Sequence, residues 1–389
     1  MAKLFIVEGP SEDKVPFLRG VLVESLVRIG LTFQDAYLLA QKVRDSIANE
    51  TEITAEALRA RVSAELRENF SESLAHAYDL GSVREREIIV RCREDESPFS
   101  AGLLSRSLQA CAIDRADAQE TAKLVHERLR SGEADVIDHI ALRQVVYESL
   151  QRFCSQAAAE RFLARQRFKE SGLPLIVLVG GITGTGKSTL TTELAYQLNI
   201  VRTQSTDMMR EIVRCYRPPK KIPTLAYSSF EAWRGLTKKA ESAGKAEPED
   251  IIRGFVSQFE AVKPGLQATI HRAVKETHDL IIDGVHVLPS RLELDAIRDK
   301  AIVIPLILVV PTKKTLAKRL KRRAREQPER ASSRYLKQLD QIWLLQSFLV
   351  AEAEEHDVPL IINNDVDEAM HELLLQISKT IAKRFPATP

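Results

Sequence analysis

The sequence predicts an α/β protein in which a doubly wound, parallel five-stranded sheet follows two mainly helical modules. The sheet is predicted by five short, largely apolar runs that alternate with helical stretches after residue 173, a pattern typical of buried parallel strands. The two modules are predicted by an internal repeat within the first 155 residues. The five apolar runs occupy residues 175–179, 200–203, 280–282, 303–309 and 360–362.

The chain has 389 residues, which is long enough for more than one domain. Its composition, 44% hydrophobic and 28% charged, is typical of a globular protein. The 56 basic and 54 acidic residues nearly balance, which argues against a nucleic-acid partner bound mainly by charge. No apolar run is long enough to span a membrane, and the first residues lack the layout of a signal peptide. The four cysteines lack metal-ligand spacing, so we expect reduced thiols. Together these features predict a cytoplasmic protein without a nucleic-acid or membrane partner.

The first part of the chain repeats itself at an offset of 82 residues. Pro16-Phe17 recurs as Pro98-Phe99, and Asp35-Ala36 recurs as Asp117-Ala118. Each copy opens with a β-prone run and an acidic turn, after which apolar residues follow at helical spacing. We therefore predict one module at 1–82, a second at 83–152, and a linker helix at 153–172 that ends at Ser171-Gly172.

Both modules resemble the ATP-cone, a small helical regulatory module that binds nucleotide and begins with a β-strand. The resemblance covers about residues 3–70 and 85–152. Where ATP-cones carry a basic dipeptide and a glycine, this chain has Glu8-Gly9-Pro10-Ser11 in the first copy and Arg91-Cys92-Arg93 in the second. The resemblance implies nucleotide sensing. The alternative is a pair of helical modules used for packing, for closure over a substrate or for homo-oligomer formation.

A phosphate loop begins the second half of the chain. Residues 181–188 read Gly-Ile-Thr-Gly-Thr-Gly-Lys-Ser and fill every fixed position of the pattern G-x-x-x-x-G-K-[ST]. An apolar run precedes the loop and a helical stretch follows it, so a bound phosphate would meet backbone N–H groups at a helix N-terminus. We expect Lys187 to reach the β- and γ-phosphates of ATP and Ser188 to ligate Mg²⁺. The residues expected to contact the nucleotide are Gly181, Thr183, Gly184, Thr185, Gly186, Lys187, Ser188 and Thr189.

Polar clusters follow the second and third predicted strands. Asp207 is placed to orient an acceptor hydroxyl or accept its proton, and Arg210, one helical turn later, is placed to bind an anionic substrate. Asp283 ends the third strand, where a carboxylate holds Mg²⁺ directly or through water, and His286 is a candidate contact for a substrate phosphate. The alternatives are a helix cap by Thr206 or Asp207 and a loop hydrogen bond by His286.

A basic helix near residues 313–325 predicts a lid at 313–335. Arg319 and Arg323 share one face of this helix, and we expect them to stabilise charge on the transferred phosphoryl group. The alternative is a solvated basic face or an RNA-binding patch. The segment 218–278 is too long for a plain crossover between strands, so it predicts a helical insertion that binds substrate.

These pieces together resemble the 2-phosphoglycerate kinase family. The resemblance rests on the sequences at 97–108, 180–189, 205–210 and 283–289 and covers about residues 85–385. It implies a phosphate-loop kinase domain at 173–389 that transfers phosphate from ATP, with Mg²⁺, to 2-phosphoglycerate and gives 2,3-bisphosphoglycerate. In that mechanism Lys187, the lid arginines and Mg²⁺ on Ser188 stabilise the phosphoryl group during transfer. Asp207 orients the acceptor hydroxyl or accepts its proton.

The motifs leave the acceptor open. A kinase of another small anionic phosphorylated alcohol, such as an inositol phosphate or a sugar acid, fits the same pattern. A regulator that binds ATP without acting on a metabolite is a third interpretation. The carboxylates of Asp207 and Asp283 favour catalysis over sensing alone.

Overall fold

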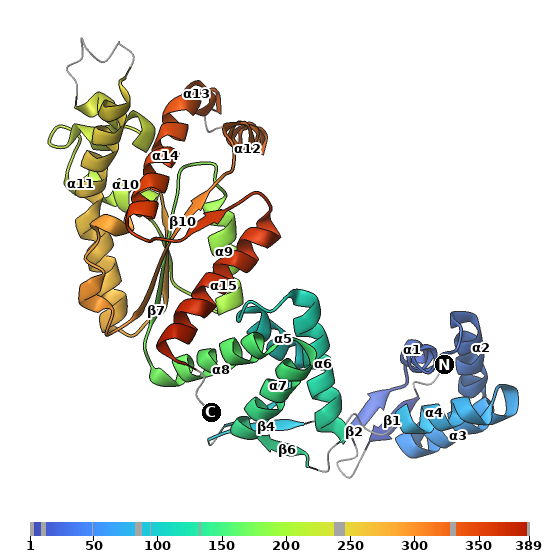
Figure 1. Cartoon of the computed structure of the whole chain (residues 1–389). Coiled ribbons are helices and arrows are strands. Elements are labelled where there is room, and N and C mark those ends of the chain that lie inside the picture. The colour runs from blue at the N-terminus through green and yellow to red at the C-terminus, as the bar shows by residue number, and fades with distance from the viewer. Residues whose placement is uncertain are drawn as a thin grey trace. The chain divides into compact units, whose positions relative to one another are not determined.

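The computed structural model describes residues 4–8, 13–48, 50–81, 88–93, 95–131, 134–236, 246–326 and 332–386, without the side chains at 8, 13, 80, 81, 323–326, 332 and 333. Contacts divide the chain into two compact units (Figure 1). The first lies within residues 1–99 and 130–138, and the second lies within residues 100–129 and 139–389.

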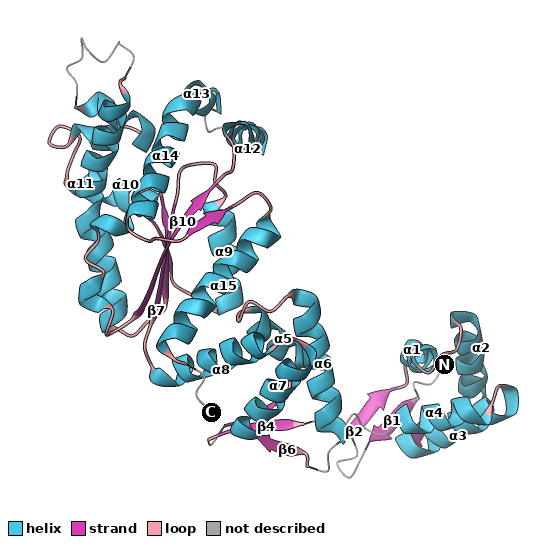
Figure 2. Cartoon of the chain, viewed as in Figure 1, coloured by secondary structure: helices cyan, strands magenta, loops and turns pink. Residues whose placement is uncertain are grey.

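The first unit contains two small sheets that share one topology (Figure 2). In each sheet the first strand pairs antiparallel with the second and parallel with the third. The strands are β1 (Phe5–Glu8), β2 (Asp13–Pro16) and β3 (Glu52–Thr54) in the first copy, and β4 (Ile89–Cys92), β5 (Asp95–Pro98) and β6 (Val136–Asp138) in the second. The repeated sequence therefore folds as a repeated sheet. The resemblance of these modules to the ATP-cone stays a prediction.

The helices of the first copy enclose a hydrophobic core of their own. They are α1 (Arg19–Arg28), α2 (Phe33–Ser46), α3 (Ala55–Asn69) and α4 (Glu72–Gly81). Leu26, Val43 and Leu66 are fully buried in this core, as the helical periodicity predicts for the first two. Thr32 caps α2 by accepting a hydrogen bond from the Asp35 N–H, so Asp35 lies in the first turn, where its charge favours the helix dipole.

The helices that follow the strands of the second copy belong to the second unit. They are α5 (Ala101–Gln109), α6 (Arg115–Ser131) and α7 (His139–Phe153), and α8 (Gln156–Ser171) follows them. The α5–α6 turn shares a core with the kinase-like sheet, because Ala110 and Ala112 pack in one cluster with Phe168 and Leu175. The stretch predicted as a linker thus contains a packed helix, which Gly172 ends in the left-handed conformation.

The central sheet has five parallel strands in the order β11-β10-β7-β9-β8, which confirms the predicted fold class. The strands are β7 (Leu175–Gly180), β8 (Thr203–Ser205), β9 (Leu280–Gly284), β10 (Ile302–Val309) and β11 (Leu360–Ile362). The bounds of β7, β9 and β10 differ from the predicted ones by one or two residues, β11 matches, and β8 is displaced most, since its predicted run is 200–203. It begins at Thr203 because the turn after α9 (Lys187–Leu198) uses Asn199 in the left-handed conformation and the Ile200 N–H donates back to Ala195.

Helices cover both faces of this sheet (Figure 1). On one face lie α11 (Pro248–Lys275) and α14 (Leu339–Glu355), with α10 (Thr206–Tyr216) beside α11. On the other face lie α8, α9 and α15 (Val366–Arg384). β7 is apolar and fully buried because both faces of the sheet are covered there, and its Leu178 and Val177 point into opposite cores as the two-residue period requires. The edge strand β8, by contrast, is polar and largely exposed. Among the described helices, none is both long enough and apolar enough to span a membrane.

The long connection between β8 and β9 is a helical insertion. It contains the 3-10 helices η1 (Pro223–Ala226) and η2 (Ser229–Gly235) and the 28-residue helix α11. Gly254 of α11 lets η2 pack directly against the helix, because a Cβ atom there would lie 2.1 Å from the Trp233 nitrogen. The connection between β10 and β11 contains α12 (Lys313–Glu326) and α13 (Ser332–Lys337) in the region predicted as a lid.

The two glycines of α11 allow a matched test of this packing. Gly254→Ala should lower the free energy of unfolding by about 1–3 kcal/mol, because η2 must move to admit the methyl group. Gly265→Ala in the same helix has no heavy atom within 4 Å of its new methyl group, and should raise stability by up to about 1 kcal/mol. Chemical denaturation measures both, and equal effects of the two substitutions would contradict this packing.

Candidate active site

The phosphate loop joins the end of β7 to the start of α9. Gly186 is the N-cap of α9 with φ of 91°, a conformation that side chains avoid. A Cβ atom at Gly186 would also lie 2.6 Å from the Nδ2 atom of Asn363, so only glycine fits. Ser188 and Thr189 in the first turn of α9 are exposed, whereas Gly181 and Thr185 are buried and Thr183 and Gly184 are half-buried. The loop therefore offers a backbone cradle with an open side.

Lys187 lies inside this cradle. Its amine donates to the Ile182 carbonyl at 2.7 Å, and only 9% of the residue is exposed. The Thr185 hydroxyl donates to the same carbonyl at 3.0 Å, which holds the loop in a closed turn. A buried cation in a loop of N–H groups attracts phosphate oxygens strongly, because little water screens the charge.

Ser188 and Asp283 form a pair of oxygen ligands next to the loop. The Ser188 hydroxyl donates to the Asp283 carboxylate at 3.3 Å. Burial raises the pKa of the Asp283 carboxyl, and the Lys187 cation and the Ser188 hydroxyl oppose that shift. This donor set fits Mg²⁺, which prefers oxygen and commonly takes one or two protein ligands together with phosphate oxygens and water. No group of three or more His, Cys, Asp or Glu side chains in the described ranges could hold a metal.

Asp207 and Arg210 lie in the first turn of α10, just after β8. Ser205 caps this helix by accepting a hydrogen bond from the Asp207 N–H at 3.2 Å, so the capping role considered for Thr206 or Asp207 belongs to Ser205. The Asp207 carboxylate is two-thirds exposed and lies 4.0 Å from the Arg210 guanidinium. Arg210 also donates to Glu211 at 2.9 Å. Asp207 is therefore available to a substrate, and Arg210 is already aligned beside it.

The loop after β9 packs tightly against the start of α10. Gly284 has φ of 152°, and a Cβ atom there would lie 1.8 Å from the Thr206 hydroxyl oxygen. That hydroxyl accepts a hydrogen bond from the His286 N–H at 3.4 Å. Asp283 and Asp207, which are 76 residues apart in the chain, are thus held at the carboxyl ends of adjacent strands.

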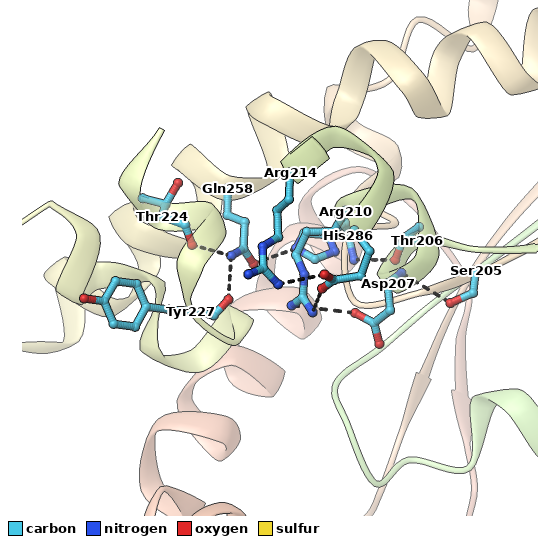
Figure 3. A network of polar contacts seen from close by, with 10 residues as sticks. Ser205, Thr206, Asp207, Arg210, Arg214, Thr224, Tyr227, Gln258 and His286 are labelled. Carbon is cyan, nitrogen blue, oxygen red and sulfur yellow. Dashed lines mark hydrogen bonds and ion pairs between the residues drawn. The ribbon is translucent and has the colours of Figure 1, made fainter. Parts of the chain in front are cut away.

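His286 is completely buried and joins the strand end to the insertion (Figure 3). The Gln258 side-chain amide donates to the backbone carbonyls of Thr224 at 2.6 Å and Tyr227 at 3.0 Å. Both amide hydrogens are then used, so the Gln258 oxygen faces His286 and accepts from its Nε2 atom at 2.8 Å. This arrangement fixes the proton of the neutral imidazole on Nε2.

The other ring nitrogen of His286 is a buried acceptor. Nδ1 has no hydrogen-bond partner in the described chain, and neither does the buried Nε donor of Arg210. The pKa of His286 is lowered to about 4, mainly by burial; the Asp207 carboxylate opposes this shift, and the Arg210 and Lys187 cations add to it. The imidazole is therefore neutral at pH 7. Its Nδ1 lone pair is enclosed by protein and suits a buried water molecule.

Arg319 of α12 joins the lid region to the phosphate loop. Its guanidinium donates to the carbonyls of Thr185 at 3.0 Å and Asn363 at 2.7 Å, and more weakly to that of Asn364 at 3.4 Å. The Asn363 amide donates to the same Thr185 carbonyl at 2.7 Å. In this arrangement Arg319 positions the loop. The side chain of Arg323, its predicted catalytic neighbour, lies outside the described residues.

Glu231 of η2 connects the insertion to α13. It is 5% exposed and accepts a hydrogen bond from the Arg334 Nε atom at 2.8 Å, while Arg234 lies 3.6 Å away. The rings of Phe230 and Tyr335 add a contact with centroids 5.7 Å apart. Local sequence patterns do not identify Glu231, Gln258 or the loop contact of Asn363, because each acts on residues far away in the chain.

The structure brings the phosphate loop, Asp207, Arg210, Asp283 and His286 to the carboxyl ends of β7, β8 and β9. This is the edge at which parallel α/β sheets bind ligands.

Comparisons with known proteins identify relatives of this chain. No family model matches it. It is 33% identical over 295 residues to a 2-phosphoglycerate kinase of Pyrococcus furiosus, which covers 76% of this chain and 94% of that protein. It is also 33% identical over 303 residues to a protein of the same name from Methanopyrus kandleri, covering 77% of this chain and 90% of that one. A protein of the same name from Pyrococcus horikoshii is 33% identical over 285 residues, covering 73% of this chain and 91% of that protein.

The pKa of His286 predicts a specific pH dependence of stability. In the folded state the His286 imidazole takes up its second proton only near pH 4, whereas in the unfolded state it does so near pH 6.5. The unfolded state therefore binds more protons between these pH values, and the free energy of unfolding should fall as the pH falls from 6.5 to 4. The loss from this one group should be on the order of 3 kcal/mol. Urea denaturation of wild type and His286→Gln between pH 7 and 4 measures it. Identical pH slopes for both proteins would contradict the assignment.

The hydrogen bonds of Arg319 predict an effect on nucleotide binding. Arg319→Met should weaken ATP binding about 10-fold, because the loop loses charge-assisted hydrogen bonds of about 1.5–3 kcal/mol. Lys321→Met, an exposed position of the same helix, is the control and should bind ATP as the wild type does. Calorimetric titration with ATP measures both variants.

Proposed function

The chain belongs to the 2-phosphoglycerate kinase family, and from this premise we propose that it transfers the γ-phosphoryl group of ATP to 2-phosphoglycerate. The products are ADP and 2,3-bisphosphoglycerate. The observation that supports this most directly is the hydrogen-bonded pair of Ser188 and Asp283 beside the buried Lys187 amine, with Asp207 on the neighbouring strand. A phosphate loop with a metal pair and an adjacent carboxylate suits phosphoryl transfer to an alcohol.

The reaction exchanges one P–O bond for another. The 3-hydroxyl oxygen of 2-phosphoglycerate forms a bond to the γ-phosphorus while the bond from that phosphorus to the β,γ-bridging oxygen breaks. The hydroxyl proton passes to the Asp207 carboxylate, which is exposed and free of any capping role. ADP retains the bridging oxygen and its charge.

Lys187 balances the charge that develops during transfer. Its amine lies inside the phosphate loop, where low exposure makes its field strong. Ser188 and Asp283 would hold Mg²⁺, which when bound neutralises phosphate charge and aligns the phosphate oxygens. Arg319 holds the loop to Asn363, and its predicted contact with the phosphoryl group requires that these hydrogen bonds be exchanged as the lid moves.

The acceptor binds next to Asp207. Arg210 carries the positive charge closest to this carboxylate and is the candidate partner for the phosphate or carboxylate of 2-phosphoglycerate. The Arg210 side chain is 17% exposed, so little water screens its charge from an anionic ligand. A poorly screened cation beside the Asp207 carboxylate supports a small phosphorylated acid as the substrate.

Lys187→Ala should lower kcat by about 10²–10³-fold or more, because the main cation on the transferred group is removed. Acceptor-dependent release of ADP from Mg-ATP measures this. Lys379→Ala on the exposed surface of α15 is the control and should keep wild-type turnover. Wild-type kcat in Lys187→Ala would remove the catalytic assignment of this residue.

The same assay identifies the acceptor when 2-phosphoglycerate, 3-phosphoglycerate, glycerate and inositol phosphates are compared. Turnover with 2-phosphoglycerate alone supports the proposal. Turnover with another acceptor keeps the kinase and replaces the substrate. ATP binding without any acceptor-dependent turnover would favour a nucleotide sensor.

A further inference from the structure

Helix α8 carries a buried guanidinium without a partner. Arg165 is 6% exposed, and its Nε and Nη1 atoms are buried with no hydrogen bond in the described part of the chain. Leaving a buried charge unpaired is strongly destabilising, so native proteins supply a counter-charge, a water molecule or a bound ion. The active-site chemistry does not use Arg165, because α8 precedes β7 and lies before the sheet begins.

The neighbours of Arg165 are mostly cationic. Arg161, Arg165 and Lys169 follow one another at four-residue spacing and share a face of α8. Arg161 is satisfied, since it donates to the carbonyls of Cys111 at 2.8 Å and Ala112 at 3.1 Å. Lys169 reaches solvent, and partial desolvation together with the Arg165 cation lowers the pKa of its amine.

The acidic groups nearby are engaged elsewhere. Burial raises the pKa of the Cys111 thiol, so this thiol stays neutral and supplies no negative charge. Glu170 pairs with Arg143, and the Asp279 carboxylate accepts the Leu175 N–H at 2.7 Å. Within the described ranges no carboxylate pairs with Arg165, so its guanidinium lacks a counter-ion, whereas the Asp279 carboxylate offsets part of the charge of Lys169.

A cavity of about 390 Å³ lies at the end of this face. Lys169, Arg202 and His278 contribute basic groups to its lining. Gly172, Arg202 and Asp279 of the same lining precede β7, β8 and β9, so the cavity lies at the amino-terminal edge of the sheet. The phosphate loop follows β7 at the opposite, carboxyl-terminal edge. The two locations are therefore separate.

We propose that Arg165 and Lys169 bind a phosphate group at the amino-terminal edge of the sheet, in an anion site separate from the phosphate loop. A phosphate dianion matches two adjacent cations, whereas a carboxylate balances only one. The planar donors of arginine suit two phosphate oxygens at once, and the lysine amine adds a point charge at the mouth of the cavity. The site therefore selects phosphate over carboxylate.

The test uses inorganic phosphate and calorimetric titration of the full chain. Lys187→Met removes the main cation of the phosphate loop, and this variant should still bind phosphate at one site. Adding Arg165→Met should weaken that binding about 10-fold or more, and adding Lys169→Met about 3–10-fold. Adding Arg298→Met, which removes an exposed cation paired only with Asp295, should leave the affinity unchanged.

Loss of all phosphate binding in Lys187→Met alone would overturn the proposal, and so would unchanged affinity after Arg165→Met. If Arg165→Met does not fold, Lys169→Met decides, because its side chain lies at the surface and unchanged affinity there overturns the site. Acetate, which carries a single carboxylate, should bind at least 10-fold more weakly than phosphate, and equal binding also contradicts the proposal. Titration of Lys187→Met with 2-phosphoglycerate then separates the sources. Binding tighter than that of inorganic phosphate, and lost in Arg165→Met, assigns the site to a phosphorylated metabolite.

Discussion

The carbonyl oxygen of Thr185 holds the candidate site together. It accepts hydrogen bonds from Arg319 at 3.0 Å and from the Asn363 amide at 2.7 Å, so one atom of the phosphate loop joins the lid helix to the end of β11. Asn363 is itself fixed by its N–H, which donates to Val309 at 2.8 Å. The position of the Lys187 amine depends on this arrangement, because Lys187 and Thr185 both donate to the Ile182 carbonyl. These hydrogen bonds connect the loop, α12 and the last strand around the place where a phosphate would bind.

The sequence predicts the sheet and the loop well because their signals are local. Apolar runs identify four of the five parallel strands closely, whereas the polar edge strand β8 overlaps its predicted run only at Thr203. The fixed spacing around Lys187 identifies the phosphate loop. The parts that sequence reasoning missed depend on distant partners. Gln258 acts on Thr224, Tyr227 and His286, and Glu231 acts on Arg334, 103 residues away. His286 also shows why a residue type is ambiguous by itself, since only its burial and its partner decide that it is neutral and which nitrogen holds the proton.

The insertion and the chemistry are coupled by backbone packing as well as by side chains. Gly254 brings η2 against α11, and Gln258, one turn later, binds carbonyls of the insertion while its oxygen holds His286. Phe255, between them, stacks on the His286 ring with centroids 6.0 Å apart. Three neighbouring residues of one helix therefore hold the insertion and His286 in place.

The shared core of the α5–α6 turn and the sheet has a consequence for where the chain can be cut. Ala110 and Ala112 of the second repeat pack with Phe168 and Leu175, whereas the helices of the first repeat enclose their own core around Leu26 and Leu66. Deleting the first copy would remove a hydrophobic core made of its own residues. A cut at residue 173 would instead leave an open hydrophobic face on the sheet, because Ala110, Ala112 and Phe168 would be lost from the shared core. The smallest fragment expected to fold with this sheet therefore begins before α5, within the second copy.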